Sequence, residues 1–154
     1  MEGCKGMYFV DRDKIEEKLI YIDNQIQLFE SQQAWNTAIE KAALERIVQM
    51  TIEAILDVGN SMIDGFIMRD PGSYDDIIDI MEDEKVITEE MSTSIKRIIG
   101  FRKNLQQDYT TVPHGELETT FHLELPSLKS FSSHIRQYLI KELEEVVTAF
   151  KPNH

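Results

Sequence analysis

A long stretch without proline, from about Thr37 to Phe66, constrains the fold of this chain more than any other feature. Its apolar residues recur every three or four positions, which is the period of an α-helix. Apolar side chains cover most of the circumference of that helix, so we predict that it is the central helix of a bundle. The main apolar stripe is Ile39, Ala43, Ile47, Met50, Ala54 and Val58, with Ile55, Met62 and Phe66 beside it.

The rest of the chain is also predicted to be helical, because apolar residues keep the helical spacing and no alternating pattern exceeds four or five residues. Asp11 or Asp13, Ser73 and Thr88 are suited to cap the starts of helices. The predicted fold class is therefore all-α, an antiparallel helical bundle of about five helices, one of them short. The helices are expected over about 11–30, 37–66, 73–84, 88 to the loop at 110–115, and 116–148, the last kinked near Pro126.

The length of 154 residues is that of one domain. We predict a single domain over residues 1–154, with loose tails at 1–8 and 149–154. Such a chain can fold without a metal or a disulfide, and Cys4 is its only cysteine. Apolar runs are far shorter than the roughly 20 residues of a membrane helix, and the N-terminus has no signal-peptide pattern. We therefore expect a cytoplasmic protein that makes no membrane contact.

Several enzyme classes are excluded because their motifs are absent. The sequence has no glycine-rich phosphate loop before a Lys-Ser or Lys-Thr pair, no Gly-x-Ser-x-Gly and no His-Glu-x-x-His. A di-iron site in a bundle needs Glu-x-x-His pairs on two helices, but Thr111, Thr119, Phe131 and Lys151 stand three positions before the four histidines. We expect neither a bound metal nor a cofactor.

Charge is strongly negative overall and unevenly distributed. The formal net charge of −12 disfavours a large sequence-independent surface for nucleic acid. Residues 69–90 contain nine acidic and two basic side chains, whereas residues 91–107 contain four basic side chains and no acid. Two interpretations stay open for the second segment: an ordinary basic end of a helix, or a small patch for one phosphate or an acidic partner.

One polar stripe runs along the predicted central helix. Its members lie three or four residues apart and fall within an arc of roughly 80°. The stripe is either the solvent face of the helix, or its middle part, Glu53 to Asp57, lines a polar cleft and pairs with Arg102 from a neighbouring helix. The members are Arg46, Gln49, Glu53, Asp57, Asn60 and Asp64.

Three segments together resemble the HepT-like family of small bacterial proteins, which belongs to the HEPN superfamily of helical domains. They are Ile-Glu-Ala-Ile-Leu-Asp-Val-Gly-Asn (52–60), Pro-Gly-Ser-Tyr-Asp-Asp-Ile (71–77) and Arg-Lys-Asn-Leu-Gln-Gln-Asp-Tyr (102–109). The resemblance covers about residues 7 to 145. It implies a homodimer in which two motif copies form one composite cleft. Toxins of this family are metal-independent endoribonucleases, encoded beside a small nucleotidyltransferase antitoxin.

The family motif is Arg, four residues, His, one residue, Tyr. By this resemblance the catalytic positions are Arg102, Gln107 and Tyr109, and Glu53, Asp57, Asn60 and Asn104 form a supporting polar cleft. Gln107 departs from the motif, because a glutamine amide forms hydrogen bonds but cannot transfer a proton as histidine does near neutral pH. Loss of proton transfer reduces rates by something like 10²–10⁴-fold. Lys103, where the superfamily often has a small polar residue, is a milder departure.

Two further residues bear on this site. In the family the tyrosine that matches Tyr109 is the hydroxyl that the antitoxin modifies with nucleotide, although an aromatic at a helix end also commonly packs against the core. His114 is the nearest histidine and is either an exposed loop residue or a substitute for the missing base.

Three hypotheses remain at this stage. The chain is a HepT-like ribonuclease toxin, active or attenuated; a dimeric HEPN module for binding or regulation without nuclease activity; or a helical bundle that shares only the fold. The residue that discriminates between the first two hypotheses is Gln107, because it cannot transfer a proton as the motif's histidine does. RNA is a compatible partner by resemblance and is disfavoured by net charge.

Overall fold

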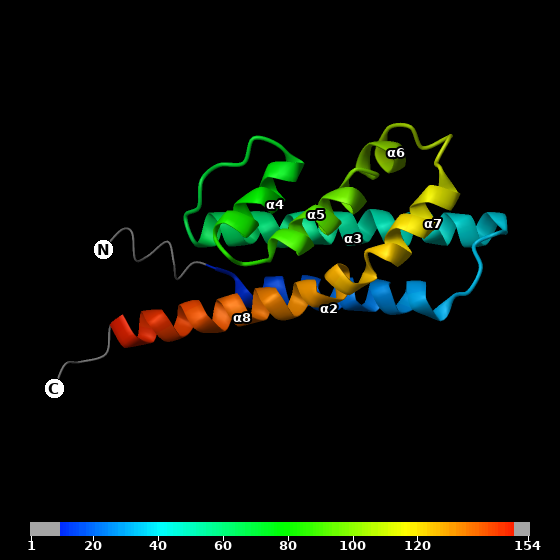
Figure 1. Cartoon of the computed structure of the whole chain (residues 1–154). Coiled ribbons are helices and arrows are strands. Elements are labelled where there is room, and N and C mark those ends of the chain that lie inside the picture. The colour runs from blue at the N-terminus through cyan, green and yellow to red at the C-terminus, as the bar shows by residue number, and fades with distance from the viewer. Residues whose placement is uncertain (1–9, 150–154) are drawn as a thin grey trace.

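The computed structural model describes residues 10–149, and all regular structure in that part is helical, as predicted (Figure 1). The predicted tails at 1–8 and 149–154 lie outside the described residues, except for Ala149, which ends the last helix. Cys4 also lies outside them. In chain order the helices are α2 (Arg12–Ser31), α3 (Ala38–Gly65), α4 (Tyr74–Asp83), α5 (Glu89–Ile99), α6 (Arg102–Gln106), α7 (His114–Leu123) and α8 (Leu125–Ala149).

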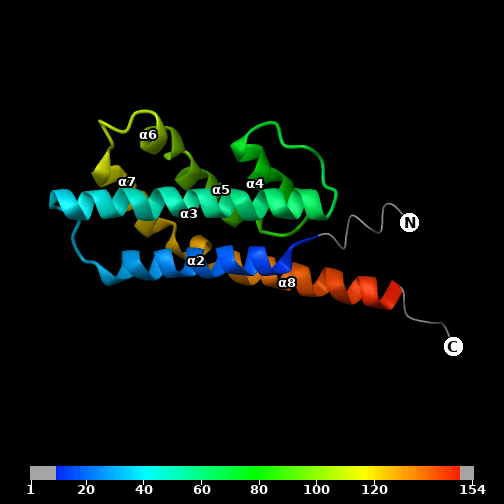
Figure 2. The ribbon, with the colours of Figure 1, turned by 180° about the vertical axis from the view of Figure 1, so that it is seen from behind.

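Helix α3 is the central helix, as its apolar circumference predicted. Helices α2, α4, α5, α6 and α7 all pack against it. The views from the front and from behind agree that α2 and α8 lie side by side on one side of α3, with α4 and α6 on the other (Figures 1 and 2). Helix α2 runs in the opposite direction to both α3 and α8 (Figures 1 and 2), and the core lies between these layers.

The start of α3 corrects the predicted apolar stripe. Thr37 caps the helix and exchanges hydrogen bonds with Glu40 in a capping box. Ile39 is 83% exposed, and Ala43 is exposed as well, because the first turns beside this cap extend past the neighbouring helices. The first buried residue of α3 is Leu44, so the predicted stripe is correct for its middle and C-terminal parts, where its members are buried or half-buried.

Two predicted helices are each divided in two. The amides of Gly100 and Phe101 bond to the carbonyls of Lys96 and Ile98, and this tighter last turn ends α5. Arg102 therefore begins the short helix α6 instead of lying inside a longer one. The predicted last helix is interrupted at Glu124, two residues before Pro126, which agrees with the kink predicted near that proline; the break divides the helix into α7 and α8.

Pro126 lies in the first turn of α8, where a missing backbone N–H costs little. The helix before the interruption, α7, begins at His114, two residues earlier than expected. Among residues 10–149, every helix is too short or too polar to span a bilayer.

The connection between α3 and α4 is held by one carboxylate. Asp76 accepts two hydrogen bonds from Arg69, at 2.7 and 2.8 Å, and a third from the backbone amide of Gly72. These bonds lower the pKa of Asp76 to about 2. Ser73 caps α4, as predicted, by accepting from the amide of Asp76. The turn therefore sets the position of Tyr74, the first residue of α4.

A close approach between α3 and α4 makes a glycine necessary at position 59. A Cβ atom built there would lie 2.4 Å from Cγ2 of Ile77, which is buried and β-branched and so cannot rotate away freely. The two helices are in direct contact at this point, which brings the start of α4 toward the middle of α3.

We predict that Gly59→Ala destabilises the protein by about 1–2 kcal/mol, because the overpacking cost of about 1–3 kcal/mol exceeds the gain in helix propensity of up to about 1 kcal/mol. The measurement is urea unfolding followed by circular dichroism. Gly115→Ala is the matched control: a Cβ there meets nothing within 4 Å, so stability should stay the same or rise. Equal effects of the two substitutions would contradict the assigned helix contact.

Candidate functional site

Arg102 and Glu53 form an ion pair that joins α6 to α3, as the polar stripe predicted. Nε of Arg102 donates to Oε2 of Glu53 at 2.7 Å, and Nη2 donates to Oε1 at 3.2 Å. The two side chains are only 22% and 26% exposed. The hydrogen bonds to the Glu53 carboxylate raise the pKa of the Arg102 guanidinium, which is therefore charged at any physiological pH.

Of the other residues of the predicted polar cleft, Asp57 pairs with a residue other than Arg102. Asp57 lies one turn further along α3 and pairs with Lys18 of α2, at 3.1 Å. Asn60 is exposed on α3, and Asn104 is half-buried on α6. Both interpretations of the stripe are thus correct for different members, since Glu53 lines a polar site and the residues C-terminal to it face solvent or α2.

Tyr74 completes the surroundings of Arg102 and was not predicted as a site residue. Its ring centroid lies 4.0 Å from Cζ of the guanidinium, a cation–π contact. Gln106 adds a longer hydrogen bond to Oε2 of Glu53, at 3.4 Å. The only sequence signal for Tyr74 was its place in the Pro-Gly-Ser-Tyr turn, one of the three segments that carry the family resemblance.

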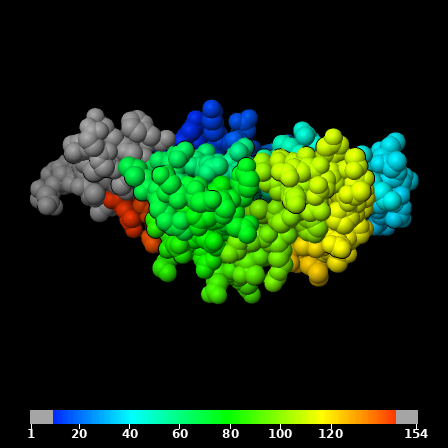
Figure 3. All heavy atoms as spheres, turned by 90° about the horizontal axis from the view of Figure 1, so that it is seen from above, coloured from blue at the N-terminus to red at the C-terminus, as the bar shows by residue number. Residues whose placement is uncertain are grey.

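A surface hollow of about 390 Å³ lies over this group. Figure 3 looks onto the same side of the molecule, where the green atoms of α4 meet the yellow-green atoms of α6. Gln107, the residue at the motif's histidine position, follows α6 as its C-cap and lines the hollow, whereas Tyr109 lies outside the hollow and is 65% exposed. The hollow is lined by Ser73, Tyr74, Asp75, Ile99, Gly100, Arg102, Lys103, Gln106 and Gln107.

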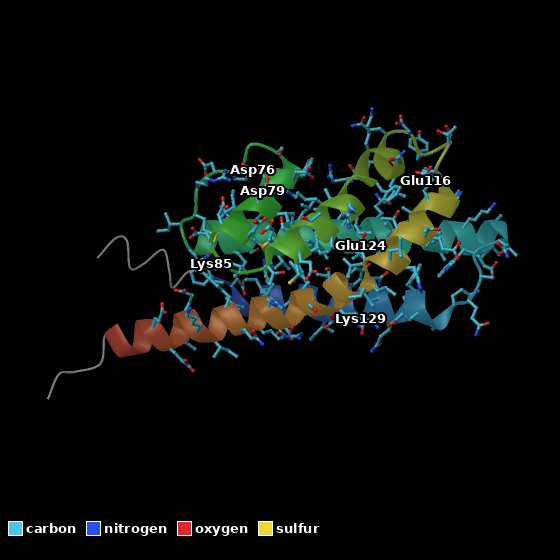
Figure 4. All side chains as sticks on the ribbon, in the orientation of Figure 1. Asp76, Asp79, Lys85, Glu116, Glu124 and Lys129 are labelled. Carbon is cyan, nitrogen blue, oxygen red and sulfur yellow. The ribbon has the colours of Figure 1, made fainter. Side chains whose placement is uncertain are left out.

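Most cations of the basic segment 91–107 are already paired. Lys96 contacts Asp79 of α4 at 2.6 Å, and Arg97 contacts Glu124 at 3.1 Å; both acidic residues are labelled in Figure 4. With Arg102 held by Glu53, the segment is mainly a set of ion pairs between helices. The interpretation as an ordinary helix end therefore applies to Lys96 and Arg97, and a phosphate patch could involve only Arg102 and Lys103.

His114 is not the exposed loop residue that was one of the two expectations. It begins α7, and its Nε2 lies 2.6 Å from Oε2 of Glu45 on α3. The side chain is 26% exposed and does not line the hollow beside Arg102. Within residues 10–149, no three His, Cys, Asp or Glu side chains form a group that could hold a metal.

Comparison with known proteins identifies the class of protein that carries this fold and site. The family model described as "Ribonuclease HepT-like" matches residues 15–135. The chain therefore belongs to the HepT-like ribonuclease family. It is 51% identical over 145 residues to "Putative RNase YutE" of Bacillus subtilis (strain 168), across 94% of this chain and 100% of that protein.

Solved structures agree on the fold. The structure of Bacillus subtilis YutE, described as a cytosolic protein of unknown function, superimposes with a TM-score of 0.83 at 46% identity, covering 95% of this chain and 97% of that one. A tri-AMPylated Shewanella oneidensis HEPN toxin in complex with an MNT antitoxin gives a TM-score of 0.67 at 21% identity, covering 84% and 98%. A chain of a toxin–antitoxin structure with AMP-PNP gives 0.70 at 19%, covering 80% and 98%. These last two show the shared fold.

We predict that Glu53→Ala lowers the free energy of unfolding by about 1–3 kcal/mol, because it leaves the half-buried Arg102 without its charged partner. Asp57→Ala serves as the control, since that ion pair is more exposed and should contribute only about 0–1 kcal/mol. Urea unfolding of the two variants measures the difference. If Asp57→Ala lowers the free energy of unfolding as much as Glu53→Ala does, the Arg102–Glu53 pair stabilises the fold no more than an exposed ion pair.

Proposed function

We propose that this protein is a HepT-like endoribonuclease with a degenerate active site, which binds RNA through Arg102 and cleaves it weakly. The observation that carries the proposal is the juxtaposition of a fixed arginine with Gln107 at the motif's histidine position, both lining one hollow. Membership of the HepT-like family supports the substrate class.

Arg102 can supply phosphate binding without further rearrangement of its helix. Glu53 occupies Nε and Nη2, so Nη1 is the nitrogen that this carboxylate does not engage. A guanidinium held in this way can donate to a phosphate oxygen and stabilise the negative charge that develops during phosphodiester cleavage. Lys103, exposed on the same hollow, adds a second cation.

Proton transfer is the step that the site lacks. Metal-free cleavage requires removal of the proton from the 2′-hydroxyl and protonation of the leaving oxygen. The amide of Gln107 can orient these groups by hydrogen bonding but cannot exchange a proton with them. The same deficiency favours a second candidate, a HEPN module that binds RNA or protein without cleaving it.

We further propose a homodimer in the cytoplasm, with a small nucleotidyltransferase antitoxin as a partner that would modify Tyr109. Tyr74 and Tyr109 are 50% and 65% exposed, and a composite cleft between two copies would be lined by both aromatic side chains and leave them open to a ligand. We expect light scattering to give the mass of a dimer at tens of micromolar protein. A stable monomer would contradict the composite cleft.

We predict weak or undetectable RNA cleavage by the wild type in EDTA, and a gain of about 10²–10⁴-fold in Gln107→His, because the imidazole restores acid–base catalysis. Cleavage of a labelled RNA followed by gel electrophoresis measures the rates. Adding Arg102→Ala to the Gln107→His variant should abolish the gain. Adding Arg97→Ala should preserve it, because that nearby arginine pairs with Glu124 outside the hollow.

Two outcomes would contradict this assignment. If Gln107→His stays inactive while the protein is folded, the binding-module alternative is favoured. If the wild type cleaves RNA well without metal and loses that activity in His114→Ala, the histidine held by Glu45 acts as the base. Gln107 would then not be the defect.

A further inference from the structure

Tyr74 is placed more rigidly than its exposure suggests. Its side chain is 50% exposed, yet its backbone is fixed by the Ser73 cap and by the bonds of Asp76 to Arg69 and Gly72. The ring rests on the guanidinium of Arg102. A large aromatic surface is therefore held beside the hollow with little freedom left to lose when a ligand binds.

The hollow combines the three kinds of group that a nucleotide needs. Arg102 and Lys103 provide positive charge for a phosphate, and Tyr74 provides an aromatic face for a base. The amides of Gln106 and Gln107 can donate to and accept from the edge of any base. A volume of about 390 Å³ is within the range of small-ligand sites. Asp75 is the one acidic side chain in the lining.

We propose that this hollow is a nucleotide subsite for single-stranded RNA, in which one base stacks on Tyr74 while Arg102 and Lys103 hold the adjacent phosphate. The inference rests on the proposed RNA-binding function and adds the position and strandedness of the bound segment. A base paired within a duplex is already stacked on its neighbours and cannot reach the ring, so the subsite selects unpaired nucleotides.

A purely positioning role for Tyr74 makes a different prediction from base stacking. If the ring only orients Arg102, its removal weakens binding to every RNA equally, including RNA that lacks a base at the contacted position. If the ring stacks on a base, removal of the ring and removal of the base cost the same interaction. Their effects are then not additive.

The test is a double-mutant cycle between the protein and an RNA octanucleotide, measured by fluorescence anisotropy in EDTA. The RNA is used intact and with an abasic ribose at each position in turn. We expect Tyr74→Leu to weaken binding of intact RNA by about 5- to 150-fold, and Tyr74→Phe to retain it. One abasic position should weaken binding to the wild type by a similar factor and have little effect on Tyr74→Leu.

Tyr21→Leu is the matched control. Tyr21 is a half-buried tyrosine on α2, which packs against α3 and α8 and contributes nothing to the hollow, so its loss should leave RNA affinity unchanged. Circular dichroism confirms that each variant is folded. Three results would each overturn the subsite. Tyr74→Leu could bind RNA as well as the wild type does; every abasic position could weaken binding equally in the wild type and in Tyr74→Leu; or the wild type could bind no RNA.

This test is separate from the test of catalysis. Binding that depends on Tyr74 together with an inactive Gln107→His variant supports the subsite and contradicts the proposed nuclease. If Gln107→His cleaves RNA while Tyr74→Leu leaves RNA affinity unchanged, the proposed nuclease is supported and the subsite is contradicted.

Discussion

Burial of α3 on most of its surface is the constraint on which the rest of the structure depends. The helices that bring Arg102 and Tyr74 together, α6 and α4, both pack against α3, and Glu53 of α3 binds Arg102. Gly59 permits the close approach of α4, and the Arg102–Glu53 pair anchors α6. The candidate site is thus assembled from segments nearly fifty residues apart because one helix serves as the support for both.

Local hydrogen bonding made much of the fold predictable from sequence. Asp11, Ser73 and Thr88 cap helices in the structure, as predicted, because a side-chain oxygen next to a helical pattern satisfies backbone amides whatever lies around it. The break at Gly100 was not predicted, and the break at Glu124 was predicted only as a kink near Pro126. No proline or polar cluster marks Gly100, and the apolar spacing continues through it, so packing between helices decides where the chain turns there.

The candidate site was predictable only in part, for a related reason. Spacing along α3 placed Glu53 and Asp57 on one face, but it could not show that Lys18 of another helix reaches Asp57. Tyr74 carries no spacing signal, because a single aromatic residue after an N-cap has no characteristic pattern. The contact with Arg102 exists only once α4 and α6 are both in place. His114 was similarly ambiguous until α7 brought it to Glu45.

The pairing of Arg102 with Glu53 limits how tightly an anion that enters the hollow can bind Arg102. The tethered carboxylate occupies Nε and Nη2 and offsets the charge of the guanidinium, so a free phosphate that binds Nη1 alone gains only a weak interaction. A polymer that also contacts Lys103 and Tyr74 gains several interactions at once and does not need to displace the carboxylate fully. The geometry of the pair therefore favours ligands that make several contacts in the hollow over small free phosphates.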